Sequence, residues 1–148
     1  MSRSEFHLPH FLPYLLNQAA EAASHEFQAY YRARYGMLRT EWRVLFHLGC
    51  YGELSAKRIC ELASLHKTKV SRAVAALESK RFLARTETEA DRRIERLSLT
   101  ASGRQTFKDL SAAAARFESE LVEGLPPEEV RLLRSVLLKM SGLDQKHP

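Results

Sequence analysis

Residues Ser55 to Leu99 read SAKRICELASLHKTKVSRAVAALESKRFLARTETEADRRIERLSL, and they contain the clearest pattern of secondary structure in the chain. Ser55 is a favourable N-cap for a short helix over 56–63. After a tight connection at 64–66, a second helix is expected over 67–80. Its apolar residues form one stripe at helical spacing, which is Val70, Ala73, Val74 and Leu77. The pattern predicts a helix-turn-helix.

The hydrophobic period then changes from that of a helix to that of a strand. The runs 82–87 and 94–99 are strand-like, and in the second run Leu97 and Leu99 alternate with polar residues. The polar connection 88–93 separates them. A helix-turn-helix followed by a hairpin is the winged-helix arrangement.

Longer helices are expected on both sides of this lobe. One covers 11–35 and ends at Gly36, a second is capped by Thr40, and another begins after Thr100. The last begins at a proline pair, and its apolar residues Val130, Leu133, Leu137 and Met140 form nearly a heptad seam. These faces are too apolar for an isolated winged helix. We therefore predict a mainly α fold with a small β-hairpin wing, a winged helix-turn-helix with N- and C-terminal dimerisation helices.

The 148 residues fit one domain, which we expect to span 1–148. Its dimerisation helices would be 1–36 and 101–148, and its DNA-binding lobe 37–100.

No apolar run approaches the roughly 20 residues needed to cross a bilayer. The first residues also lack the apolar core of a signal peptide. These features predict a cytoplasmic protein with no membrane partner.

The positive charge is concentrated in the predicted lobe. Residues 57–96 hold 11 basic and 6 acidic residues, and their excess of +5 equals the net charge of the whole chain. A clustered basic surface is typical of proteins that bind a polyanion. Double-stranded DNA is the expected partner, although a solvated basic face would have the same composition.

The predicted recognition helix carries small and polar residues opposite its apolar stripe. Arg72 is the best candidate for reading a base, because arginine forks onto guanine O6 and N7. Thr68 and Ser71 suit contacts with bases or phosphates, and Lys67 and Lys69 suit phosphates. On the wing, Arg92 and Arg93 could enter a minor groove. An ordinary polar surface helix and a solvated charge run are the simpler explanations of these residues.

Several segments together resemble the multiple-antibiotic-resistance regulator (MarR) family. They are Thr40-Glu41-Trp42-Arg43-Val44-Leu45, Lys69-Val70-Ser71-Arg72, Asp91-Arg92-Arg93 and Leu97-Ser98-Leu99-Thr100-Ala101-Ser102-Gly103. The resemblance covers most of the chain. It implies a homodimer with intertwined terminal helices that binds a palindromic operator, usually as a repressor relieved by a ligand or an oxidant. Arg81 departs from the pattern, because members usually carry glycine between the recognition helix and the wing.

Aromatic and cationic residues gather on the first two predicted helices, where relatives often bind ligands. From this we expect a small aromatic effector near Tyr30, Arg34 and His47. An ordinary aromatic core would account for the same residues.

Cys50 and Cys60 have no CxxC spacing, so a disulfide framework and a cysteine-rich zinc site are excluded, and we expect two partly buried thiols.

No cofactor, metal site or catalytic group is predicted. The sequence has no glycine-rich phosphate loop, no GxSxG and no HExxH. The prediction is therefore a sequence-specific, ligand-responsive transcription regulator rather than an enzyme. The alternatives are a winged-helix module that binds proteins without specific DNA binding, and an enzyme acting on a small aromatic compound.

Overall fold

The computed structural model of the chain describes residues 5–88 and 91–145 and, at 88 and 91–94, the backbone alone. The elements in chain order are η1 (Leu8–His10), α1 (Leu12–Tyr35), α2 (Arg39–Tyr51), β1 (Leu54–Ser55), α3 (Ala56–Ala63), α4 (Lys67–Ser79), β2 (Leu83–Thr88), β3 (Asp91–Leu99), α5 (Ala101–Leu121), α6 (Pro127–Ser141) and η2 (Leu143–Gln145). The mainly α fold with a small β-hairpin wing is confirmed.

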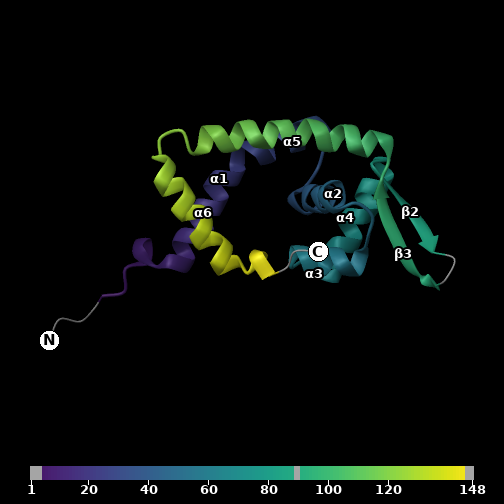
Figure 1. The fold of residues 1–148 in the computed structure, drawn as a ribbon, viewed down its shortest axis with the longest axis horizontal. Helices are drawn as coiled ribbons and strands as arrows, with labels where there is room; N and C mark the ends of the chain where they lie inside the picture. Colours follow the sequence, from purple (N-terminus) through teal and green to yellow (C-terminus); the bar gives the residue numbers. More distant parts are fainter. Residues whose placement is uncertain (1–4, 89–90, 146–148) are drawn as a thin grey trace.

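The long helix α5 connects two parts of the molecule. Figure 1 shows the hairpin of β2 and β3 at one end of α5 and α6 at the other. Helices α1 and α2 both pack against α5, and α2 also packs against α3 and α4. The winged lobe therefore joins the terminal helices through α5 and the second half of α1.

The core lies where α2, α3, α4 and the sheet meet. The apolar stripe predicted for the recognition helix is buried throughout, at Val70, Ala73, Val74 and Leu77. Ile59 of α3 and Val44 and Leu45 of α2 are fully buried against it. Burial of one stripe fixes which face α4 turns outward, because successive residues are about 100° apart around a helix.

The wing is larger than the sequence predicted. The sheet has three antiparallel strands in the order β1-β3-β2, and the two-residue strand β1 was missed. Leu54 pairs with Leu97, and Ser55 pairs with Arg96. The strand β3 also begins at Asp91, so the backbone of 91–93 belongs to a strand and not to the connection. Two residues are too short a run for an alternating pattern to be visible.

The caps predicted for three helix starts are confirmed at two of them and wrong at the third. Ser55 and Thr100 cap α3 and α5 as predicted, with hydroxyls that accept from Arg58 N at 3.1 Å and Gly103 N at 3.0 Å. Thr40 does not cap α2. That helix begins at Arg39, because the Glu41 carboxylate accepts from the Leu38 amide at 2.9 Å and so satisfies an earlier N–H.

Helix α4 ends in a Schellman motif centred on Arg81. The Arg81 amide donates to the Glu78 carbonyl and the Phe82 amide donates to the Leu77 carbonyl, each at 2.9 Å. Arg81 therefore has the left-handed φ of 64° that the motif requires. The chain between the recognition helix and the wing therefore has the left-handed conformation that glycine usually adopts there, although this residue is Arg81.

Glycine has a packing role at the start of α5. A Cβ placed on Gly103 would lie 1.9 Å from the carbonyl oxygen of Phe82. The Thr100 amide also donates to that carbonyl at 3.1 Å. Thr100 and Gly103 thus pack the start of α5 directly against the chain that leaves α4.

The terminal helices carry apolar residues that the chain itself does not cover. No residue of α6 is buried, and its exposed apolar residues are Leu132, Leu133, Val136, Leu137, Leu138 and Met140. Phe6, Phe11 and Leu12 are exposed at the other end of the chain. Within the described residues, no helix has the length and apolar character needed to span a membrane.

Candidate nucleic-acid interface and effector chamber

The outward face of α4 presents every residue predicted to touch DNA on that helix. Lys67, Thr68, Lys69, Ser71 and Arg72 are all exposed. His66 is the N-cap of this helix, and its Nδ1 accepts from the Thr68 amide at 3.2 Å. Lys67 and Lys69 thus stand at the amino end of the helix, where free N–H groups also attract phosphate.

Some basic side chains of residues 57–96 form ion pairs with acidic side chains, and others do not. Lys80 pairs with the buried Glu41 at 2.7 Å, and Arg85 pairs with Glu78 and Glu95 at 3.0 and 2.8 Å. By contrast, the structure gives no hydrogen bond or ion pair to the side chains of Lys67, Lys69 and Arg72 within its described ranges. The outward face of α4 therefore presents cations that no acidic side chain of the described residues neutralises.

The wing arginines can be placed only by their backbone. Residues 92 and 93 lie in β3, two to three residues from the hairpin connection. The side chains of Arg92 and Arg93 lie outside the described residues. Their contact with a minor groove therefore stays a prediction.

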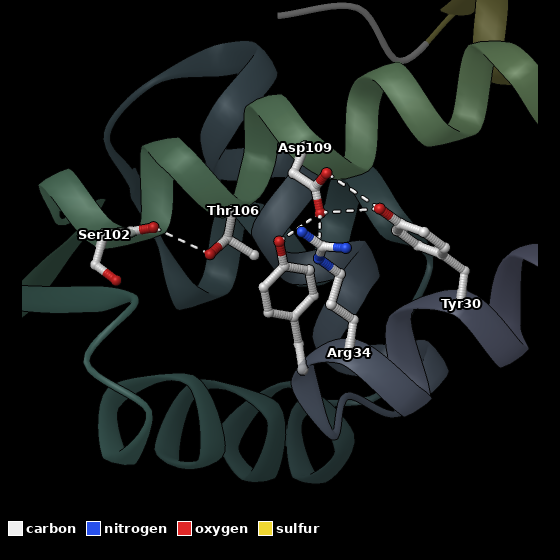
Figure 2. A network of polar contacts seen from close by, with 6 residues as sticks. Tyr30, Arg34, Ser102, Thr106 and Asp109 are labelled. Carbon is white, nitrogen blue, oxygen red and sulfur yellow. Dashed lines mark hydrogen bonds and ion pairs between the residues drawn. The ribbon is translucent and has the colours of Figure 1, made fainter.

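The residues predicted to bind an effector do not surround one space. Tyr30 and Arg34 both meet Asp109 of α5, as Figure 2 shows. Tyr30 Oη donates to the two carboxylate oxygens at 3.1 and 3.2 Å, and Arg34 Nε lies 3.2 Å from Oδ2. His47 lies apart, with Nδ1 2.5 Å from the Arg43 carbonyl oxygen and its ring against Tyr51.

Asp109 is the acceptor at the centre of this contact between α1 and α5. Tyr35 Oη also donates to Asp109 Oδ2, at 2.5 Å. The hydrogen bond from Tyr35, with those from Tyr30 and the charge of Arg34, lowers the pKa of the Asp109 carboxyl. The guanidinium of Arg116 adds a further cation 5.7 Å from the Tyr30 ring centroid. Asp109 is therefore held as a carboxylate.

A separate cavity of about 710 Å³ lies between α1, α2 and α5. We call it the α1–α2–α5 chamber. Its aromatic walls are Phe27 and Tyr31 of α1, Trp42 of α2 and Phe117 of α5, and its cations are Arg39 and Arg43 of α2. Aromatic walls with a few charged groups are typical of sites for small organic ligands.

The polar groups that line the chamber are mainly donors, and the carboxylate of Glu118 of α5, which pairs with Arg134, also lines it. Trp42 Nε1 is buried and has no hydrogen-bond partner in the part of the chain described by the structure. Burial raises the pKa of the Tyr31 hydroxyl, and Arg39 beside it opposes the rise, so Tyr31 stays protonated near neutral pH. The phenol of Tyr31 and the guanidinium groups of Arg39 and Arg43 suit a ligand that is aromatic and anionic.

An open apolar groove of about 550 Å³ runs along α6. It is lined by Leu121 of α5 and by Val130, Leu133, Leu137 and Met140 of α6. These four α6 residues are the seam predicted from the sequence. A groove of this size and apolar character is energetically unfavourable in water unless another surface covers it.

Sequence reasoning missed Asp109, Arg39 and the contact made by Arg43. Asp109 meets Tyr30 and Tyr35, which are 79 and 74 residues away in the chain. No local pattern relates groups so far apart. Arg39 and Arg43 are one helical turn apart on α2, and their spacing could have marked a common face.

Comparison with known proteins supports the same reading of the lobe. The MarR family model matches residues 35–94. The chain is similar to YwaE, an HTH-type transcriptional regulator of Bacillus subtilis (strain 168), with 29% identity over 107 residues. That alignment covers 72% of this chain and 63% of YwaE, less than two thirds of that relative.

Solved structures match over nearly the whole chain. A MarR family transcriptional regulator from Silicibacter pomeroyi is 27% identical, with a TM-score of 0.79 and coverage of 95% of this chain and 93% of the other. BpsR of Bordetella bronchiseptica, described as regulated in DNA binding by 6-hydroxynicotinic acid, has a TM-score of 0.84. It is 23% identical, with coverage of 93% and 98%, and shows the fold alone.

Proposed function

The chain belongs to the MarR family of winged-helix transcription regulators, and we propose that it is a homodimeric, ligand-responsive repressor that binds a palindromic operator. The observation that carries this proposal is the outward face of α4. One face of that helix is buried in the lobe core, and the other presents free Lys67, Lys69 and Arg72 with Thr68 and Ser71.

In the proposed complex, α4 enters the major groove of double-stranded DNA. Arg72 forks onto a guanine, and Thr68 and Ser71 contact bases or phosphates. Lys67 and Lys69 neutralise phosphates near the amino end of the helix. Arg92 and Arg93 of the wing enter the adjacent minor groove.

The homodimer follows from the uncovered apolar surface. The α6 groove and the exposed apolar residues before and within α1 lie on the terminal helices, away from α4. A second copy covers both. Two recognition helices related by a two-fold axis then face successive major grooves, about 34 Å apart along one side of the duplex.

The α1–α2–α5 chamber is the proposed effector site. Its aromatic walls and the guanidinium groups of Arg39 and Arg43 favour an aromatic carboxylate. BpsR, which shares the fold, is regulated by an acid of this class. The effector lowers operator affinity only if it binds more tightly to the conformation that does not fit the operator.

We infer a regulatory role without catalysis, supported by the family and by its structural neighbours, which are transcription regulators. A protein that acts on a bacterial operator works where the chromosome is, so we place it in the cytoplasm.

Selection of DNA by the purified protein from a random duplex pool tests the proposal. An enriched palindrome is the expected result. Binding without any sequence preference would instead support the protein-interaction alternative.

Sedimentation tests the dimer. The wild type should sediment as twice 16.9 kDa, and the double variant Leu133→Glu, Leu137→Glu as the monomer. Lys139→Glu adds acidic charge to the same helix without removing an apolar side chain, and should remain dimeric. A wild-type monomer at micromolar concentration would refute the assembly.

A further inference from the structure

Arg43 contacts two parts of the molecule with one side chain. It lines the α1–α2–α5 chamber. Its Nη2 also donates a hydrogen bond of 3.0 Å to the carbonyl oxygen of Ala63. The guanidinium thus reaches from the wall of the chamber to the end of α3.

The Ala63 carbonyl lies immediately before the turn that positions the recognition helix. Ala63 is the last residue of α3, Ser64 turns the chain with a left-handed φ of 54°, and α4 begins at Lys67. The last four carbonyls of a helix have no amide partner within it. Arg43 supplies a partner from α2, and so ties the start of α4 to the chamber wall.

We propose that Arg43 is the positioning residue that links occupancy of the chamber to the placement of α4. The proposal rests on the proposed function, and specifies how that function is regulated. A carboxylate in the chamber competes with the Ala63 carbonyl for the guanidinium, because a hydrogen bond between two charged groups is the stronger one. Once the Ala63 carbonyl loses this donor, the turn at 64–66 loosens and α4 no longer fits the groove.

Arg39 provides a matched control. It lines the same chamber from the same helix, one turn earlier. No hydrogen bond to α3 is present at Arg39 among the described residues. Arg39 can therefore add to the affinity for an anion without holding the turn.

The first experiment needs neither operator nor effector. Backbone amide exchange is compared in the full-length wild type, Arg43→Met, Arg43→Lys and Arg39→Met proteins. Arg43→Met should speed exchange at residues 64–68 by about tenfold, which is the effect of losing one charged hydrogen bond. Arg43→Lys should restore part of the protection, and Arg39→Met should resemble the wild type. Equal protection in Arg43→Met and wild type would overturn the proposal.

The second experiment uses benzoate as the probe and benzamide as its neutral analogue. Benzoate, but not benzamide, should speed exchange at 64–68 in the wild type and weaken its operator binding by about tenfold, within the usual range of allosteric coupling. Arg43→Met should show no further change at saturating benzoate. Arg39→Met should need more benzoate but reach the full wild-type response.

The outcomes separate the two proposals. Benzoate that fails to bind, or that binds without loosening residues 64–68, refutes the anion route through Arg43. A full benzoate response in Arg43→Met refutes it as well. Failure of the wild type to select any operator would instead refute the proposed function, and the exchange measurements would still decide whether Arg43 holds the turn.

Discussion

Tyr35, the last residue of α1, donates a hydrogen bond of 2.5 Å to Asp109 of α5. The Tyr35 ring also packs edge-on against Phe82, the residue that follows the exit from the recognition helix. Through this pair, the terminal helices contact the winged lobe at a defined point. These contacts join the end of α1 to α5 and to the chain that leaves α4.

Replacing Asp109 by alanine should therefore destabilise the protein. The change removes one acceptor that serves Tyr30, Tyr35 and Arg34, and we expect a loss of about 1 to 3 kcal/mol at pH 7. Urea unfolding measures it. Glu26→Gln, at an exposed residue of α1, should change stability little. An equal loss in both variants would contradict the role of Asp109.

The same carboxyl should make stability depend on acid. Hydrogen bonds from Tyr35 and Tyr30 and the charge of Arg34 lower the folded pKa of Asp109. Its contribution is present above the unfolded pKa of about 3.9, and it is lost as pH falls through the lower folded value. The difference in unfolding free energy between the wild type and Asp109→Asn should shrink below about pH 4. A difference that is constant from pH 7 to pH 3 would show that the charge of Asp109 is not involved.

Arg81→Gly should stabilise the protein. Arg81 has a left-handed φ of 64°, which costs a residue with a Cβ about 1 to 2 kcal/mol, and glycine avoids that cost but loses some backbone entropy. The expected net gain is about 0.5 to 1 kcal/mol in urea unfolding. Arg81→Ala removes the same charge but keeps the strain, so it should show no gain.

Gly103→Ala should be strongly destabilising. The added methyl would lie 1.9 Å from the Phe82 carbonyl oxygen, so α5 or the start of the wing must move. Overpacking of this kind costs about 1 to 3 kcal/mol. Gly124→Ala is the control, since its added methyl meets no atom within 4 Å. Thermal unfolding measures both variants, and equal melting temperatures for Gly103→Ala and Gly124→Ala would contradict the packing role of Gly103.

Arg72 and Lys69 should differ in how their loss affects DNA binding. Arg72→Ala should cost about 1 to 3 kcal/mol per half-site and relax the preference at one base position. Lys69→Ala should weaken all sequences alike and reduce the salt dependence. Operator affinity across single-base changes and salt concentrations distinguishes them. If Arg72→Ala lowered affinity equally for every sequence, Arg72 would be a phosphate contact.

Features that depend on neighbouring residues could be predicted from the sequence. The caps Ser55 and Thr100, the buried stripe of α4 and the helix stop at Gly36 follow from hydrogen bonds and periodicity within a few residues. The outward face of α4 follows from the same stripe. The lobe and the residues of α4 that are proposed to contact DNA could therefore be predicted from the amino-acid sequence alone.

Contacts between distant elements were decided only by the tertiary structure. Asp109 finds its tyrosines across more than 70 residues of chain, and Arg43 finds the Ala63 carbonyl 20 residues away. Glu41 shifts the start of α2 from the residue after Thr40 to Arg39, while its carboxylate is buried against Lys80. A side chain's partner depends on how helices pack, and packing is a property of the whole core.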